Sequence, residues 1–196
     1  MGPRALLAEV ADAGEALALA TWVRSARLAP DEVVPAARTV LVDGIDDLDH
    51  ARDVLSRWQP TAEMPAGDLV EIRVHYDGAD LESVAALWGT DPAGVVARHT
   101  ATDFVSAFCG FAPGFAYLAG LPDDLAVPRL DSPRSRVPAG AVGLAASWCG
   151  VYPTASPGGW QLIGRTDEVL WDPAAERPAL LAPGTRVRFR DASADR

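Results

Sequence analysis

The sequence contains no lysine, and all 17 of its basic residues are arginine. Its 27 acidic residues bring the formal net charge to −10. Nucleic acids and anionic membranes bind proteins mainly through cationic side chains that neutralise phosphate, so this charge argues against both as partners. The absence of lysine also excludes a P-loop, and no GxGxxG motif follows a predicted strand.

Cysteine is almost as scarce, with only Cys109 and Cys149 present. One pair cannot form a disulfide framework, and no Cys/His spacing fits a zinc site, so we predict buried thiols and no metal centre. Long hydrophobic runs are also missing. The uncharged stretch of residues 104–122 is broken by glycine and proline, which favours strands and turns over a membrane helix. Acidic residues interrupt the first apolar segment, where a signal peptide would be uninterrupted, and we predict a cytoplasmic protein.

A chain of 196 residues with 49% apolar and 22% charged residues is typical of a globular protein of one or two domains. Strand signals at residues 4–10, 38–42 and 69–76 alternate with helical signals at 15–26 and 47–58. This order predicts a small α+β domain over residues 1–77. Two short helices over residues 78–100, the first capped by Asp80, are expected to form a helical connection.

The sequence pattern changes in residues 101–196, where short apolar runs recur between glycine and proline turns. This pattern predicts an all-β domain, either a compact barrel or a sandwich.

Three segments of this second domain are candidates for a binding site. In residues 110–122, the Pro113-Gly114 turn is surrounded by Phe111, Phe115 and Tyr117. These aromatic residues could form one wall of a small-molecule pocket, or they could pack a barrel corner; the spacing alone leaves both open.

Residues 128–143 place Arg129, Arg134 and Arg136 among three prolines, which stiffen the loop. From residue 132 to 166 there are no acids and three arginines, the third being Arg165. A guanidinium group offers a planar set of donors suited to a carboxylate or phosphate, so this segment predicts an anion site. The alternative is that these arginines pair with the acid-rich N-terminal half.

The third segment, residues 152–166, contains a tight turn at Gly158-Gly159-Trp160, flanked by the donors Gln161 and Arg165. Among the histidines, His99 is the candidate for proton transfer, because Asp103 lies four residues on and could orient its ring if the helix continued. The alternative is a histidine that only complements the end of its helix.

Taken in order, the segments GFAPGFAYLAGLP, PRLDSPRSRVPAGAVG, GVYPTASPGGWQLIGRT and LLAPGTRVRF resemble the family that contains the B subunit of 5-oxoprolinase, the Kip-type histidine-kinase inhibitor and allophanate hydrolase subunit 1. The resemblance covers nearly the whole chain. It implies an α+β N-terminal domain and a cyclophilin-like β-barrel at the C-terminus. One departure is Ala141, where the family commonly has serine.

The resemblance implies that the chain is a subunit of an ATP-dependent 5-oxoprolinase, which opens 5-oxo-L-proline to L-glutamate, and that it is inactive alone. Its expected partners are a cyclophilin-like second subunit, similar to the C subunit of 5-oxoprolinase or to allophanate hydrolase subunit 2, and a lactam-utilisation-type subunit. ATP would be used by the complex. Two other functions stay open: an inhibitor that binds a sensor histidine kinase, and a subunit of an allophanate or urea-amidolyase-type hydrolase. The matching positions, which we take as candidate substrate-binding residues together with Gln161, are Phe111, Pro113, Gly114, Phe115, Tyr117, Arg129, Arg134, Arg136, Gly158, Gly159, Trp160 and Arg165.

Overall fold

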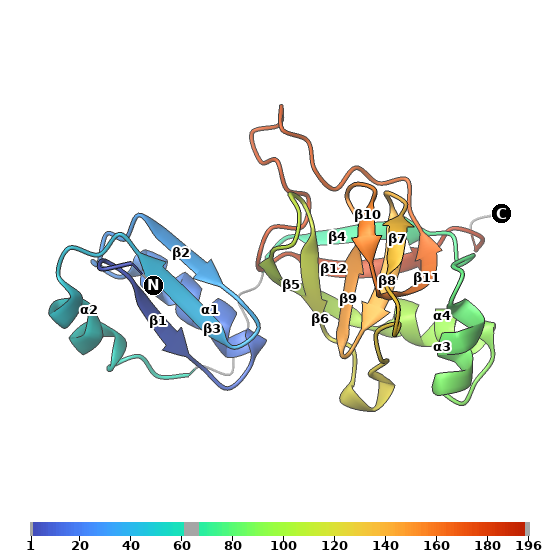
Figure 1. The fold of residues 1–196 in the computed structure, drawn as a ribbon, viewed down its shortest axis with the longest axis horizontal. Coiled ribbons are helices and arrows are strands. Elements are labelled where there is room, and N and C mark those ends of the chain that lie inside the picture. The colour runs from blue at the N-terminus through green and yellow to red at the C-terminus, as the bar shows by residue number, and fades with distance from the viewer. Residues whose placement is uncertain (1, 61–66, 195–196) are drawn as a thin grey trace. The chain divides into compact units, whose positions relative to one another are not determined.

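The computed structural model describes residues 2–60 and 67–194, which divide into two compact units at residues 67/68. The first unit contains an antiparallel three-stranded sheet in the order β1-β3-β2 (Figure 1). Its strands are β1 (Leu6–Glu9), β2 (Glu32–Pro35) and β3 (Thr39–Asp43). The edge strand β2 was not predicted, because it is only four residues long and ends on a proline.

Two helices complete the first unit, α1 (Ala13–Ser25) and α2 (Leu48–Leu55). Asp12 caps α1 by accepting from the Glu15 amide, and the Glu15 carboxylate accepts from the Ala11 amide in return. The first bond satisfies an amide that the first helical turn leaves without a partner, and the second ties the residue before the cap to the helix. Helix α1 buries a strip of small and aliphatic side chains against Val40 and Val42 of β3, which forms the core of the unit.

The second unit is built on a seven-stranded sheet in the order β11-β8-β9-β6-β5-β12-β4. A bridge between His75 and Arg165 joins the ends of β4 and β11, so the sheet is a nearly closed barrel (Figure 1). Its strands are β4 (Leu69–Val74), β5 (Asp103–Cys109), β6 (Ala116–Ala119), β8 (Ala141–Ala145), β9 (Trp148–Val151), β11 (Gln161–Arg165) and β12 (Arg186–Asp191). The predicted fold class, an α+β unit followed by a β-barrel, is confirmed.

The strand predicted at residues 69–76 belongs to this barrel and not to the N-terminal domain. Strand β4 pairs in parallel with β12, from Leu69 opposite Arg186 to Val74 opposite Asp191. The division therefore lies at 67/68, whereas the sequence placed it at 77. The local pattern of β4 identifies a strand, but its partner is the last strand of the chain, which no local signal reveals.

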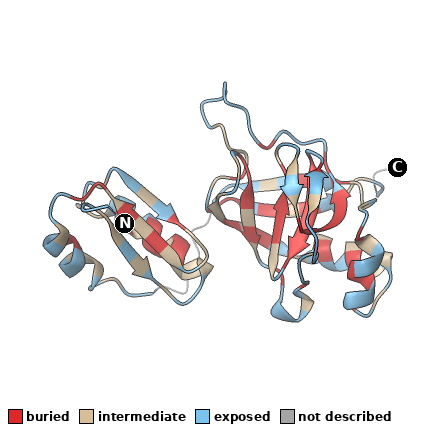
Figure 2. Ribbon diagram, in the orientation of Figure 1, coloured by how far each residue is buried: buried red, intermediate tan, exposed pale blue. Residues whose placement is uncertain are grey.

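The two short helices are α3 (Leu81–Leu87) and α4 (Pro92–Ala101). They pack on β11 and β12, and Val84, Val95 and Trp88 enter the same buried cluster as Phe104 and Phe189 of the barrel. Residues 78–100 are thus part of the barrel unit rather than a connection between domains. Figure 2 shows many of the buried residues of this unit along its strands.

A second, smaller cluster lies under a two-stranded ribbon made of β7 (Arg134–Val137) and β10 (Ser156–Gly158). Phe115, Tyr152 and Trp160 are its large members, and Tyr117 and Trp148 pack against it. A 3-10 turn, η1 (Asp123–Leu125), precedes the ribbon. All three segments predicted to carry a site converge on this ribbon and cluster. No helix in the described part of the chain is long and apolar enough to cross a membrane.

Candidate functional site

Arg134, at the start of β7, is held by an ion pair inside the barrel unit. Its Nη2 lies 2.7 Å from Oδ1 of Asp80, whose other oxygen accepts from the Leu162 amide at 2.6 Å. Asp80 is only 7% exposed, so its charge is compensated by these two donors and not by water. Arg134 therefore anchors the ribbon to α3, and its charge is already balanced.

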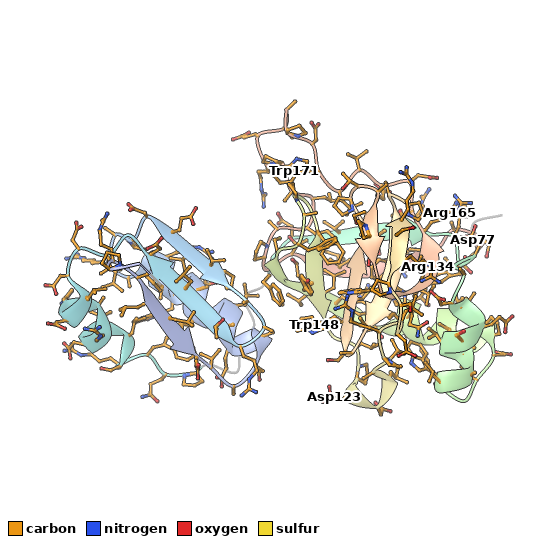
Figure 3. The ribbon with its side chains drawn as sticks, viewed as in Figure 1. Asp77, Asp123, Arg134, Trp148, Arg165 and Trp171 are labelled. Atoms are coloured by element: carbon orange, nitrogen blue, oxygen red, sulfur yellow. The ribbon has the colours of Figure 1, made fainter. Side chains whose placement is uncertain are left out.

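Arg165, at the end of β11, is also paired. Its Nε lies 3.0 Å from Oδ2 of Asp77 on the surface (Figure 3). Both acids, Asp77 and Asp80, come from the segment that links β4 to α3. For these two arginines the structure supports the alternative in which the basic segment pairs with the acid-rich half of the sequence.

Arg129 and Arg136 remain as the exposed cations of the segment, and neither forms an ion pair with another described residue. The Arg129 guanidinium lies beside Gly159, and Arg136 lies on β7, which pairs with β10. Leu130 donates from its amide to the Gly159 carbonyl at 2.8 Å, which fixes the Arg129 loop on the glycine turn. The exposed positive charge of the predicted anion site thus gathers around the β7–β10 ribbon.

Tyr152 lies beneath this ribbon, and the sequence did not single it out. Its hydroxyl meets the position that a Cβ on Gly158 would take, so the glycine leaves room for the phenol. Burial raises the pKa of Tyr152, and the nearby Arg129 and Arg134 oppose that shift. The phenol is therefore protonated at neutral pH and lies in the field of the arginines. The only signal in the sequence is weak, because Tyr152 stands six residues before the glycine pair.

The aromatic residues of the first segment form a layered cluster. Phe115 is 1% exposed, and its ring centroid lies 5.2–5.4 Å from those of Tyr117, Tyr152 and Trp160. Phe115 and Trp160 are core residues that support the surface above them. Phe111, by contrast, is 61% exposed and rests on Phe115 at 5.3 Å. Of the predicted aromatic wall, Phe111 is the residue most open to a ligand.

Phe111 occupies a strained turn. Its φ is +71°, a left-handed conformation that costs a residue with a side chain about 1–2 kcal/mol. The exposed Pro113 follows, and Gly114, with φ +83°, leaves room for Trp171, whose Cβ lies 2.7 Å from where a Cβ would stand. The Ala112 and Phe115 amides are used within the turn itself. The turn thus presents an aromatic ring, and these two of its N–H groups are not available to a ligand.

Gln161 is 7% exposed and donates from Nε2 to the Pro128 carbonyl at 3.2 Å, while its Oε1 has no partner among the described residues. It ties the start of the arginine loop to β11. The amide nitrogen of Gln161 thus already donates within the protein. Its predicted role as a hydrogen-bond donor to a ligand stays a prediction.

His99 is fully buried near the C-terminal end of α4. Its Nδ1 lies 2.7 Å from the Tyr76 hydroxyl, and its Nε2 lies 3.3 Å from the Cys149 sulfur. Burial lowers the pKa of His99 to about 3, and raises the pKa of both the Tyr76 phenol and the Cys149 thiol. These three groups form a neutral polar chain in the core, out of reach of a ligand at the ribbon.

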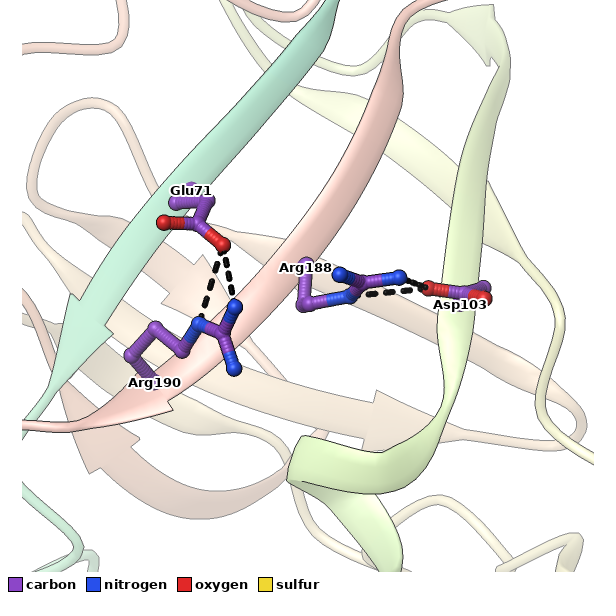
Figure 4. Close-up of polar contacts among 4 residues, drawn as sticks. All are labelled: Glu71, Asp103, Arg188 and Arg190. Carbon is purple, nitrogen blue, oxygen red and sulfur yellow. Dashed lines mark hydrogen bonds and ion pairs between the residues drawn. The ribbon is translucent and has the colours of Figure 1, made fainter.

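The predicted pairing of His99 with Asp103 is wrong. Helix α4 ends at Ala101, and Asp103 begins β5, where its side chain faces outward and accepts from Arg188 at 2.7 and 3.0 Å (Figure 4). The change from helix to strand between the two residues turns the carboxylate away from the ring. The four-residue spacing would have aligned them only in a continuous helix.

No group of three or more histidine, cysteine or acidic side chains among residues 2–60 and 67–194 is arranged to hold a metal ion. What the described site offers is an exposed guanidinium group beside a glycine turn, a second exposed arginine on β7, a buried phenol and an exposed aromatic ring. This arrangement can bind a small anion with an apolar body. It contains no nucleophile paired with a base.

Comparisons with known proteins found related sequences and related structures. A family model described as the carboxyltransferase domain, subdomain C and D, matches residues 1–181. Among curated proteins, the B subunit of 5-oxoprolinase from Escherichia coli O157:H7 is 49% identical over 140 residues, covering 69% of this chain and 64% of the relative. The protein of the same name from Bacillus subtilis (strain 168) is 46% identical over 124 residues, covering 62% and 52%. The chain thus spans less than two thirds of the length of these relatives.

Solved structures are also similar. The crystal structure of TTHA0988 superposes with a TM-score of 0.80 at 36% identity, covering 96% of this chain and 40% of that one. A conserved uncharacterized protein, PH0987 from Pyrococcus horikoshii, gives a TM-score of 0.61 at 33% identity, with 97% and 95% covered. The Kluyveromyces lactis urea amidolyase shares the fold at 17% identity, with a TM-score of 0.69 over 99% of this chain and 14% of that one.

Proposed function

The chain belongs to the carboxyltransferase subdomain C and D family, and we propose that it acts as a subunit of an ATP-dependent 5-oxoprolinase. In that role it would help to open 5-oxo-L-proline to L-glutamate together with other subunits. The observation that carries the proposal is the 49% identity with a protein named as the B subunit of 5-oxoprolinase, and the exposed Arg129 and Arg136 support it.

The substrate fits the surface around the β7–β10 ribbon. 5-Oxo-L-proline is a carboxylate on a small ring; the exposed Arg129 lies beside Gly159, and the exposed Arg136 lies on β7 of the same ribbon. A guanidinium group binds a carboxylate through two parallel hydrogen bonds. The exposed ring of Phe111 offers an apolar surface next to the same cluster. We therefore assign Arg129 and Arg136 to the substrate carboxylate and Phe111 to the ring.

The remaining chemistry is assigned to partner subunits. The chain has no lysine and no P-loop, so we expect ATP to bind elsewhere in the complex. The described site also lacks a nucleophile with its base, which suits a subunit that is inactive alone. We propose a cyclophilin-like second subunit and a lactam-utilisation-type subunit as the partners, with the cytoplasm as the location. His99 is proposed no longer as a catalytic group but as a core residue.

The test is glutamate release from 5-oxo-L-proline and ATP by the complex of this chain with the subunits encoded beside it, with and without this chain. Arg129→Ala and Arg136→Ala should each raise the KM for 5-oxo-L-proline by about tenfold, the effect of losing one charged hydrogen bond. Arg186→Ala, an exposed arginine at the start of β12, is the matched control and should leave KM unchanged. Full activity without this chain, or unchanged KM in both variants of a folded complex, would refute the proposal.

One observation favours a second candidate, the inhibitor of a sensor histidine kinase. Phe111, Val169 and Trp171 are 61%, 69% and 37% exposed, and Trp171 packs beside Gly114 in the Phe111 turn. Exposed apolar groups on neighbouring loops are typical of protein-binding surfaces. If the complex does not open 5-oxo-L-proline, the second function is tested on a sensor histidine kinase encoded beside this chain. Its autophosphorylation is measured with the wild-type chain and with Trp171→Ala, which separates the two functions. The urea amidolyase likeness shows the shared fold and does not favour that alternative further.

A further inference from the structure

A cavity of about 670 Å³ lies at the edge of the barrel where β4 and β12 end. Because these two strands are parallel and in register, the residues that follow them come together at one edge. His75, Tyr76 and Asp77 follow β4, and Asp191 and Ser193 lie at the end of β12; all five line the cavity. Its volume is in the range of small-molecule sites. The residues assigned to 5-oxo-L-proline do not line it.

The opposite wall is apolar and comes from one face of α4. Pro92, Ala93, Val96, Ala97 and Thr100 recur at helical spacing along it, and Leu81 of α3 adds to the wall. The helix is fixed beneath by Val95 and His99, which are completely buried in the barrel core. The wall is therefore rigid, and it offers a surface for a short hydrocarbon body.

The polar lining is acidic. It contains the carboxylates of Asp77 and Asp191, and the described residues that line the cavity include no arginine. Asp191 accepts from the Ser193 amide and hydroxyl at 2.9 and 2.8 Å, which holds the carboxylate in place. Asp77 is bound by Arg165 from the β11 side at 3.0 Å. Arg73 and Arg190 line an adjoining hollow instead, where Arg190 is bound to Glu71 (Figure 4).

Tyr76 connects this cavity to the core. Its hydroxyl is directed inward to His99 at 2.7 Å, so the hydroxyl is not offered to the cavity that Tyr76 lines. An aromatic ring attracts a cation that lies within about 6 Å of its face. The cavity thus combines an aromatic ring, two carboxylates and an aliphatic wall.

We propose that this cavity binds a small organic cation, a primary ammonium group on a short aliphatic body. The ammonium group sits between Asp191 and Asp77, beside the ring of Tyr76, and the aliphatic body lies along α4. A carboxylate ligand is repelled by both acids, and a neutral alcohol lacks the charge interaction. Arg165 competes with the ammonium group for Asp77.

The experiment is an NMR titration of the full chain with three probes of equal length: n-hexylamine, hexanoate and hexan-1-ol. Hexylamine should bind saturably and at least about fivefold more tightly than either of the others. Asp191→Asn should weaken hexylamine about tenfold, and Ala97→Trp, at an exposed position of the wall, should abolish binding by filling the cavity. Arg165→Ala should tighten it by freeing Asp77. Asp123→Asn, an exposed acid of η1, is the matched control and should change nothing.

Three results would overturn the proposal. If hexan-1-ol binds as tightly as hexylamine, the cavity is an apolar groove that does not select its ligand by charge. Equal affinity in wild type and Asp191→Asn would remove the carboxylate from the site. No saturation by hexylamine up to about 10 mM, which corresponds to a binding free energy of under about 3 kcal/mol, would leave no site at all. The backbone spectrum of each variant confirms that it is folded.

Discussion

Acidification should destabilise the barrel unit through His99. This histidine is completely buried, and burial lowers its pKa from 6.5 to about 3 in the folded protein. In the unfolded chain it takes up a proton below its ordinary pKa of 6.5, whereas the folded protein resists protonation until near pH 3. The stabilisation is therefore complete above pH 6.5 and is lost progressively as the pH falls toward 3. The slope is about 1.4 kcal/mol per pH unit, so the loss from His99 at pH 5 is about 2 kcal/mol.

The assay is urea unfolding at pH 7, 6 and 5, followed by tryptophan fluorescence, to which the barrel unit contributes Trp88, Trp148, Trp160 and Trp171. His99→Gln should be less stable at pH 7 but should lose about 2 kcal/mol less than wild type on going to pH 5. The contributions of carboxylates that titrate in both proteins cancel when the stability losses of the two proteins are subtracted. His50→Gln, at an exposed position on α2, should keep the wild-type slope. An equal loss in His99→Gln and wild type would refute the assignment of a neutral, buried imidazole.

Three further outcomes are expected. Asp80→Asn should lower the free energy of unfolding by about 2–4 kcal/mol, because it leaves Arg134 without its buried partner; a urea midpoint unchanged from wild type would contradict this. Phe111→Gly should change the free energy of unfolding by less than about 1 kcal/mol, because relief of the left-handed strain offsets the lost packing of a ring that is 61% exposed. The same substitution should raise the KM for 5-oxo-L-proline in the assembled enzyme. A fall in stability of several kcal/mol would show that the ring is structural. Gly158→Ala should destabilise the ribbon in wild type but much less in a Tyr152→Ala background, and equal effects in a double-mutant cycle would refute the contact between them.

Local patterns in the sequence identified most of the secondary structure. The helices α1 to α4 and the strand β4 are marked by periodicity and capping residues near the observed bounds. The domain boundary was misplaced because it depends on the pairing of β4 with β12, which joins the two ends of the barrel unit. Periodicity within a window cannot report a partner so far along the chain. The resemblance to a known family predicted the barrel. The register of its strands could be read only from the structure.

The candidate site was predicted only in part for a related reason. Composition located the arginines, but not which of them have partners; Asp80 and Asp77, which bind Arg134 and Arg165, lie far away in sequence. His99 and Asp103 have helical spacing, yet the chain leaves the helix between them. In each case the deciding contact is long-range, or it depends on a change of secondary structure within one turn.

The position of β12 has a consequence for how the protein is made. This strand is the last of the described chain, yet it lies between β5 and β4 and pairs with both. During synthesis β4 leaves the ribosome long before its partner exists, and the barrel has an open seam until β12 is complete. The first unit draws only on residues before 68 and can fold while the rest is still being translated. Closure of the barrel by such a distant pairing is intrinsically slow, so an early stop before Arg186 would release a sheet with two exposed edges.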